Sequence, residues 1–310
     1  MNRVRLGRSG LMVSPICYGS WQLSPTFWGD LPREQAVAAM RRAFEVGVNF
    51  YDTADAYGDG LSEQVLGEAL KPLHRDQVVV ATKVYHRFYP DGRRHPDLSG
   101  KYILDECDAS LQRLQMDYID LYQCHAFDPL TDLAETTEAL EKLKQAGKVR
   151  AYGASNFTVE QLRAARSFGD YATLQPRYNL LQSQAEADLL PYCQAEDIGV
   201  LAYSPLYHGL LTGKYTGAET FSDLRRHIPD FQGERFKELA GRVSALAPIA
   251  EKYALSIVQL VLVATLMSPM IHSAIVGIKN PEQIVDAAGA MGKAISREDY
   301  FAVRRTLGSA

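Results

Sequence analysis

Short runs rich in β-branched and aromatic residues alternate with amphipathic segments along almost the whole chain. Short apolar runs bounded by turn residues are typical of buried strands. Eight such units within 310 residues, with no break in composition, predict one closed (β/α)8 TIM barrel as a single domain over residues 1–310. An open doubly wound sheet is the less favoured arrangement. The expected strands cover residues 15–19, 48–52, 78–83, 119–124, 149–154, 172–175, 199–203 and 274–277.

Helices are expected between these runs. Segments 33–46 and 102–114 each repeat apolar residues at the three- and four-residue spacing of one helix face. Both should therefore pack that face on the barrel. Two residue pairs have the spacing of capping boxes at helix N-termini, namely Thr158 with Gln161 and Asn280 with Gln283.

The two ends of the chain and two long connections depart from the repeating unit. Residues 3–13 resemble two short strands, which predicts an N-terminal β-hairpin that caps the bottom of the barrel. A final helix should begin at Ser296, as part of additional helical structure at the C-terminus. Segments 20–32 and 204–233 are long for connections in a compact domain, and such connections are usually lids or binding loops.

Composition narrows the class of partner. The formal net charge is −4 and no basic block is present, so neither nucleic acid nor a membrane surface is an expected partner. The first ten residues lack the apolar centre of a signal peptide, and no apolar run approaches the length of a membrane span. These features predict a cytoplasmic protein that acts on a small molecule.

The cysteines indicate neither a disulfide framework nor a metal site. Cys17, Cys107, Cys124 and Cys193 lie far apart in the sequence, without ligand spacing. We expect reduced thiols and no bound metal. Cys124 stands beside His125, which leaves a reactive nucleophile as the alternative to an inert buried thiol.

Three consecutive expected strands end in polar side chains. The first carries Asp52 and, five residues later, Tyr57; the next ends in Lys83 and the third in His125. Since neighbouring parallel strands end at the same edge of a barrel, these four groups should converge. Each alone has a simpler explanation: Asp52 as a helix cap, Tyr57 as packing, His125 as a hydrogen-bonded core residue. A lysine inside an apolar run, however, requires a carboxylate partner.

Reduction of a carbonyl group gives these four residues distinct roles. The reaction needs a proton on oxygen as well as a hydride on carbon, and Tyr57 is the candidate acid. An ammonium group such as Lys83 would lower the pKa of the phenol, and Asp52 would keep that lysine charged. His125 could donate a hydrogen bond to the carbonyl oxygen. The four residues therefore predict proton-transfer chemistry.

The motifs that carry these residues resemble those of the aldo-keto reductase family. DTADAYG, ATK, LYQCH, GASNF, LQPRYN, AYSPL, GLLTGKY and IVGIKNPEQI occur in the family's order and cover nearly the whole chain. The resemblance implies a (β/α)8 reductase that binds NADP(H) in an extended form, and it assigns the same catalytic roles to Asp52, Tyr57, Lys83 and His125. It implies reduction of an aldehyde, ketone or sugar-derived carbonyl to an alcohol by hydride transfer, with Tyr57 as proton donor.

Cofactor contacts are expected along the later strand ends. Amide and hydroxyl groups there would hold the nicotinamide, Tyr203 would stack on its ring, and glycines in the following loop would admit the pyrophosphate. At the last helix, Lys279 and Gln283 match the family, but Asn280 and Ala287 replace the expected residues, so NADP(H) is favoured while NAD(H) remains an alternative. The expected contacts are Trp21, Asp52, Ser155, Asn156, Gln175, Tyr203, Ser204, Pro205, Leu206, Gly209, Gly213, Lys214, Gly277, Lys279 and Gln283.

The substrate pocket is predicted from aromatic residues in the loops nearest the tetrad. Trp21, Trp28, Tyr85 and Phe88 would line an apolar pocket, although such aromatics also serve as anchors within loops. Two other classes of protein are alternatives to a reductase. Channel β-subunits resemble this family and bind NADP(H), so a regulatory subunit is the alternative function. A barrel lyase or hydrolase would need paired carboxylates or a metal cluster, and only Asp52 is found.

Overall fold

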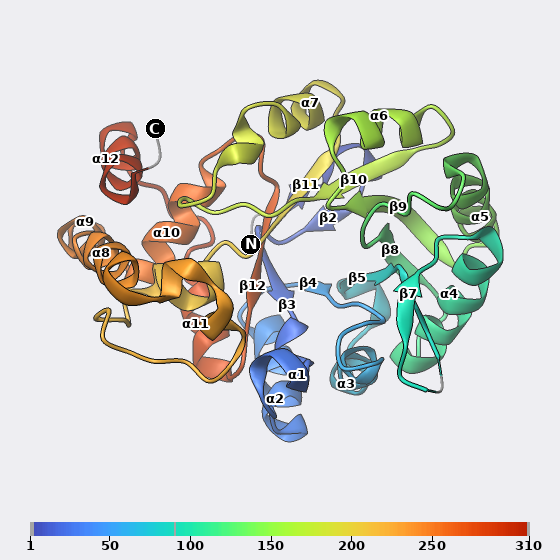
Figure 1. Ribbon diagram of the computed structural model, residues 1–310, viewed down its shortest axis with the longest axis horizontal. Coiled ribbons are helices and arrows are strands. Elements are labelled where there is room, and N and C mark those ends of the chain that lie inside the picture. The colour runs from blue at the N-terminus through green and yellow to red at the C-terminus, as the bar shows by residue number, and fades with distance from the viewer. Residues whose placement is uncertain (1–2, 90, 309–310) are drawn as a thin grey trace.

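The computed structural model describes residues 3–89 and 91–308, which form a closed barrel of eight parallel strands surrounded by helices (Figure 1). Each expected run contains one barrel strand, with bounds that differ by at most two residues. The predicted fold class is therefore confirmed. Around the barrel the strands are β10 (Tyr171–Gln175), β11 (Gly199–Tyr203), β12 (Ser273–Gly277), β3 (Ile16–Gly19), β4 (Phe50–Asp52), β5 (Val79–Val84), β8 (Ile119–Cys124) and β9 (Val149–Ser155).

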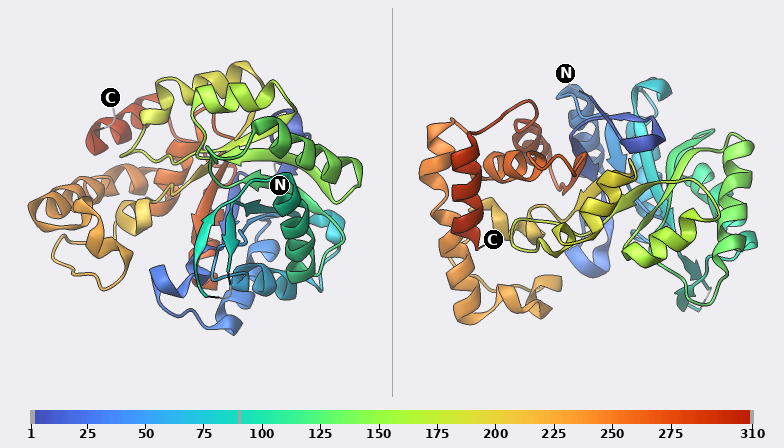
Figure 2. Two further views of the ribbon diagram at one scale, coloured as in Figure 1. Left: turned by 45° about the vertical axis from the view of Figure 1, so that its right-hand side comes forward. Right: turned by 90° about the horizontal axis from the view of Figure 1, so that it is seen from above.

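Amphipathic helices cover the outside of the barrel, as the two further views in Figure 2 show. They bury their apolar faces: on the first long helix Ala36, Met40 and Ala43 are inaccessible to solvent. These helices are α2 (Arg33–Glu45), α3 (Leu61–Leu70), α4 (Gly100–Leu114), α5 (Leu133–Gln145), α6 (Val159–Arg166), α7 (Leu189–Ala195), α10 (Ile257–Leu266) and α11 (Pro281–Ala288).

The N-terminal caps confirm one expected capping box and change the other. Thr158 and Gln161 form the reciprocal box. At α11 the Asn280 side chain accepts from the Gln283 backbone, but Gln283 Oε1 accepts from the backbone N–H of Lys279 at 2.8 Å, one residue before the position that a box requires. That second capping box is therefore only half formed.

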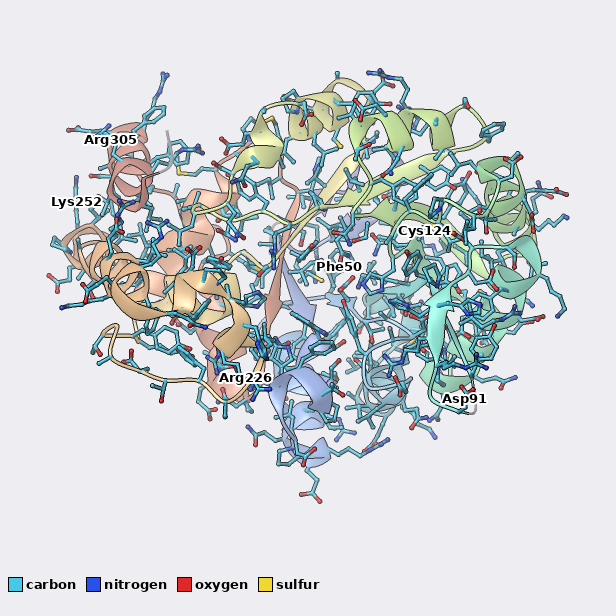
Figure 3. The ribbon with its side chains drawn as sticks, viewed as in Figure 1. Phe50, Asp91, Cys124, Arg226, Lys252 and Arg305 are labelled. Atoms are coloured by element: carbon cyan, nitrogen blue, oxygen red, sulfur yellow. The ribbon has the colours of Figure 1, made fainter. Side chains whose placement is uncertain are left out.

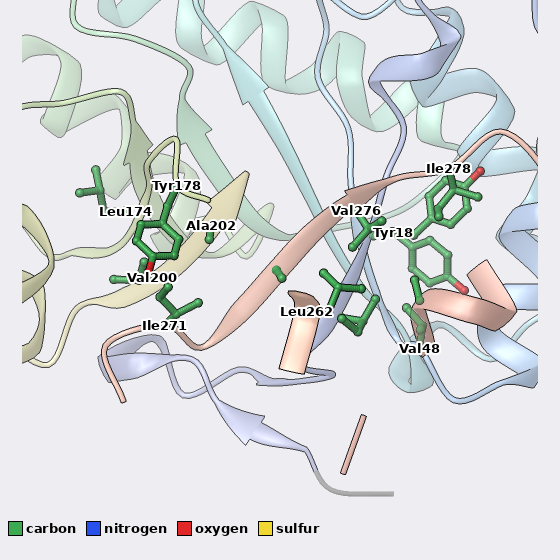
Figure 4. Packing of buried hydrophobic residues seen from close by; sticks show 14 of the residues in the cluster. Tyr18, Val48, Leu174, Tyr178, Val200, Ala202, Leu262, Ile271, Val276 and Ile278 are labelled. Atoms are coloured by element: carbon green, nitrogen blue, oxygen red, sulfur yellow. The ribbon is translucent and has the colours of Figure 1, made fainter. Parts of the chain in front are cut away.

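Two apolar layers hold the fold together. The larger lies between strands and helices, where Leu262 of α10 and Val276 of β12 take part (Figure 4). The smaller fills the barrel, with Phe50 near its centre (Figure 3). The predicted hairpin pairs β1 (Val4–Arg5) with β2 (Met12–Val13), and Leu6 and Val13 join the inner layer. The hairpin closes the end opposite to the carboxyl ends of the strands, which leaves that rim for a site.

Further elements occupy the connections and the C-terminus. The segment after β3 contains the short α1 (Pro25–Trp28), and an unexpected antiparallel hairpin, β6 (His86–Phe88) with β7 (Arg94–Pro96), follows β5. The connection after β11 contains three 3-10 helices, η5 (Tyr207–Thr212), η6 (Leu224–His227) and η7 (Pro229–Phe231). The outer helices are α8 (Gly233–Ser244), α9 (Ala247–Lys252) and, after the Ser296 cap, α12 (Arg297–Leu307).

No single helix among the described residues is long and apolar enough to cross a membrane. Segments Gly233–Lys252 and Ile257–Leu266 reach that length and composition only together, across a bend of 85°. Residues 260–265 of α10 are buried within the protein.

Candidate active site

A buried lysine joins three of the four predicted catalytic positions. Lys83 Nζ donates to Asp52 Oδ1 at 2.7 Å, to the Thr53 carbonyl at 2.8 Å and to Tyr57 Oη at 3.1 Å. Adjacent parallel strands β4 and β5 supply the ion pair, and the turn after β4 brings back the tyrosine. The carboxylate partner that the sequence requires for Lys83 is therefore present.

The electrostatics of this group keep both protons in place at neutral pH. Burial lowers the pKa of Lys83, but Asp52 and Tyr57 outweigh that effect and the net shift is upward. Burial raises the pKa of Tyr57 to about 12, although Lys83 acts in the opposite direction. Lys83 therefore lowers the pKa of Tyr57 as expected, but the loss of hydration outweighs the ammonium charge and the net shift is upward. The phenol is a protonated donor.

His125 stands beside this group as a neutral imidazole. It follows β8, its ring centroid lies 5.8 Å from that of Tyr57, and its buried Nδ1 has no hydrogen-bond partner among the described residues. Burial, Lys83 and His86 all lower its pKa well below the ordinary value. A neutral imidazole with one N–H can donate to a substrate oxygen without carrying charge.

A polar network along the next strand ends fixes the positions of these groups. Gln175 Nε2 donates to Asp52 Oδ2 at 2.8 Å. Asn156 Nδ2 donates to the His125 carbonyl at 3.0 Å, and Tyr203 Oη donates to Asn156 Oδ1 at 2.8 Å. The amides that were expected to hold a nicotinamide thus also orient the catalytic group.

One cavity of about 830 Å³ extends from the tetrad along the carboxyl ends of β11 and β12 to the start of α11. This volume lies within the range of small-molecule and cofactor sites. The predicted residues that line it are Trp21, Trp28, Asp52, Tyr57, His125, Ser155, Asn156, Gln175, Tyr203, Ser204, Pro205, Leu206, Gly209, Lys214, Gly277, Lys279 and Gln283.

Four predicted site residues do not line this cavity. Lys83 is one of them, and it lies behind Asp52 and Tyr57, which do line it. Gly213 adopts a positive φ of 76° beside Ile257, which explains the glycine by backbone conformation and close packing. Tyr85 donates through its hydroxyl to the Phe127 carbonyl at 3.4 Å. Phe88 lies under the Arg94 guanidinium in the β6–β7 hairpin. Both aromatics are therefore anchors within loops, the alternative interpretation of the sequence pattern.

Five arginine and histidine residues that the sequence pattern did not indicate also line the cavity. In the sequence Arg225 stands beside Arg226, and paired arginines usually lie on a solvated surface. In the structure Arg225 instead pairs with Asp223 and faces the Trp28 ring, with Cζ 5.9 Å from the ring centroid. The sequence contained one indication of their role: several of these residues lie in the long loops or directly after a strand, where binding residues are common. The five are His86, Arg94, Arg177, His208 and Arg225.

The far end of the cavity fits the phosphates of a dinucleotide. Lys214 and Lys279 face it, and the positive end of the α11 helix dipole lies there. Burial lowers the pKa of both lysines, and Arg225 lowers each further, so positive charge is crowded at this end. Buried polar atoms without protein partners, Gln22 Oε1 and Trp28 Nε1, belong to residues that line the same space. The residues present therefore suit a nicotinamide dinucleotide.

Comparison with known proteins shows the family of this chain. The model of the aldo/keto reductase family matches residues 15–307, and the chain belongs to that family. The family carries out NAD(P)H-dependent carbonyl reduction, and membership in it supports an oxidoreductase. Within the described residues no cluster of His, Cys, Asp and Glu suited to a metal ion is found.

Individual relatives include enzymes and a channel subunit. Aldo-keto reductase YhdN of Bacillus subtilis is 38% identical, covering 99% of this chain and 94% of the relative. The NADH-specific methylglyoxal reductase of Escherichia coli is 35% identical, with 98% of each chain covered. A rice protein named as a probable voltage-gated potassium channel subunit beta is 34% identical, covering 94% of this chain and 91% of the relative.

Solved structures share the whole barrel. Glycerol dehydrogenase AKR11B4 of Gluconobacter oxydans has a TM-score of 0.91 and 32% identity, covering 99% of this chain and 95% of that chain. An aldo/keto reductase of Klebsiella pneumoniae in complex with NADP and acetate has a TM-score of 0.79 and 29% identity, covering 100% of this chain and 96% of that chain.

Proposed function

We propose that this protein reduces the carbonyl group of a small aldehyde, ketone or sugar derivative to an alcohol, with Tyr57 as proton donor. The observation that carries the proposal is the contact of Lys83 Nζ with both Asp52 and Tyr57 in a cavity that His125 also lines. The reduced nicotinamide, when bound, would supply the hydride that the carbonyl carbon accepts.

Residues of this chain would protonate the carbonyl oxygen and donate a hydrogen bond to it. The Tyr57 phenol donates its proton as negative charge gathers on the carbonyl oxygen, and Lys83 stabilises the phenolate that remains. Neutral His125 donates a hydrogen bond to the same oxygen, a contribution of roughly 3 kcal/mol in comparable oxyanion sites. Asp52 and Gln175 hold Lys83 in position through a hydrogen-bonded chain.

NADPH is the proposed cofactor, with NADH as the alternative. Lys214, Arg225 and Lys279 gather positive charge at the end of the cavity where the adenosine phosphate would lie. The E. coli relative named as NADH-specific shows that family members of this kind differ in preference. Both cofactors therefore belong in the first assay.

The similarity to a named potassium channel subunit supports a second candidate, an NADP(H)-binding regulatory subunit. The change in reduced-nicotinamide absorbance, measured with a panel of aldehydes, ketones and sugars in both reaction directions, distinguishes the reductase from the regulatory subunit. The absorbance falls during reduction and rises during oxidation. Turnover of at least one carbonyl compound supports the reductase. Tight NADPH binding without turnover of any compound would favour the regulatory subunit.

A further inference from the structure

Arg177 lines the cavity, and no salt bridge to a described carboxylate neutralises its charge. It follows β10 by two residues, its side chain is exposed, and it pairs with Tyr203 in an isolated parallel bridge. Its Nη2 lies 3.4 Å from His208 Nε2, while no carboxylate oxygen of residues 3–89 and 91–308 lies within ion-pair distance. The other lining arginines, Arg94 and Arg225, pair with Asp59 and Asp223 respectively.

Arg177 lies toward the catalytic end of the cavity, where it neighbours Tyr203 and His208. Burial raises the pKa of Tyr203, while Arg177 and Lys83 act in the opposite direction, so this ring lies within reach of both charges. At the other end, burial, Arg225 and Lys279 lower the pKa of Lys214, so these three cations lie near one another. The dinucleotide phosphates thus have their own cations, and Arg177 is left for another group.

The carboxylates that line the cavity are already engaged. Asp52 pairs with Lys83, and Asp286 accepts hydrogen bonds from Ser256 and Gln259. An anion beside Arg177 would therefore meet no free carboxylate in the described lining. A guanidinium presents paired N–H donors that match carboxylate and phosphate oxygens.

We infer that Arg177 binds an anionic group of the substrate, which is an aldehyde or ketone that also carries a carboxylate or a phosphate. This inference rests on the proposed carbonyl reduction and names the substrate class of the same site. The expected substrates therefore carry a charge, unlike methylglyoxal and glycerol, the compounds for which two of the similar proteins are named. Arg177 would contribute to substrate selection, while Tyr57 and His125 act on the oxygen.

Matched pairs of compounds test the preference. The carboxylate pair is 4-oxobutanoate and its methyl ester; the phosphate pair is glyceraldehyde 3-phosphate and glyceraldehyde. In the wild type, the charged member of one pair should have a higher kcat/KM than its uncharged counterpart. Arg177→Met should reduce the ratio of these two kcat/KM values by ~10- to 100-fold. Arg177→Lys should restore part of it. Arg297→Met, which removes an exposed arginine from α12, should leave the ratio unchanged.

Direct binding provides a measurement that needs no turnover. The chain has two tryptophans, Trp21 and Trp28, and both line the cavity, so their emission reports on its occupancy. Succinate or glycerol 3-phosphate should change this emission in the NADP complex of wild type, and much less in that of Arg177→Met. Arg177-dependent binding without turnover of any carbonyl compound would retain the anion site and reject the reductase. Turnover without charge preference, and with an unchanged ratio in the variant, would reject the anion site alone.

Discussion

Lys83 Nζ and Asp52 Oδ1 form a 2.7 Å ion pair in which neither side chain is more than 4% exposed. Two buried charges are costly to desolvate, and their attraction repays that cost only with good geometry and additional hydrogen bonds. Here Gln175 satisfies the second oxygen of Asp52, and Tyr57 and Thr53 accept from Lys83. The pair therefore both stabilises the rim of the barrel and holds the proposed proton donor.

Tyr57→Phe should reduce kcat by at least ~100-fold, because it removes the proposed proton donor and keeps the ring. The hydroxyl contacts Lys83, while the phosphate end of the cavity is formed by other residues. NADPH affinity, measured by fluorescence titration, should therefore remain close to that of wild type. A variant that keeps more than roughly a tenth of kcat would contradict the assignment.

Lys83→Met should abolish activity and lower the melting temperature, since it leaves Asp52 as a buried carboxylate without its cation. Breaking such a pair from one side typically costs about 3–5 kcal/mol. The double variant Asp52→Asn with Lys83→Met should recover part of that stability and none of the activity. Thermal melts in which the two losses simply add would show that the residues are not coupled.

Lys279→Ala should weaken NADPH binding by ~10- to 100-fold and hardly affect NADH, if its ammonium group contacts the 2′-phosphate. Without cofactor, Lys279 Nζ lies 3.4 Å from the Trp28 carbonyl, an uncharged partner that a phosphate can replace. The wild-type ratio of NADPH to NADH affinity must be measured first, and it should shrink as salt rises. Lys293→Ala removes the same charge from an exposed site after α11 and serves as control. Equal losses for both cofactors in Lys279→Ala would reject the contact.

Acid should destabilise the protein through the half-buried His208. Burial, with Arg177 and Arg225, lowers the pKa of His208 from 6.5 to about 4. Between those values the unfolded chain binds the proton more readily, so stability that is present at neutral pH is lost as pH falls through this window. Between neutral pH and pH 4, the melting temperature of His208→Gln should fall less than that of wild type. The melting temperature of His74→Gln, a substitution at an exposed position, should fall as much as that of wild type. A wild-type melting temperature that stays constant through this window would exclude the effect.

Several features of the fold and site could be predicted because they depend on local patterns. The eight strands follow from short apolar runs, and the capping box at Thr158 follows from residue spacing. Lys83 within an apolar run requires a carboxylate, and Asp52 on the preceding strand provides it. These predictions held because parallel strands bring their carboxyl ends to one rim, whatever the loops do.

Other features depend on packing between distant segments. Tyr85 and Phe88 are aromatic residues of the kind that line pockets, but Tyr85 contacts the Phe127 carbonyl and Phe88 packs under Arg94 within the β6–β7 hairpin. The net rise in the pKa of Tyr57 depends on how far the folded chain excludes water, which residue spacing does not reveal. The half-formed box at α11 likewise depends on where the Gln283 side chain finds a donor.

The sequence by itself determined the barrel, its order of strands and helices, and the convergence of Asp52, Tyr57, Lys83 and His125, because strand periodicity and parallel connection are local properties of the chain. Only the tertiary structure decided which loop residues reach the cavity. Among the described residues it left Arg177 without a paired carboxylate on that cavity, and it placed Arg225 opposite Trp28, since a side chain's environment is made by segments far from it in sequence.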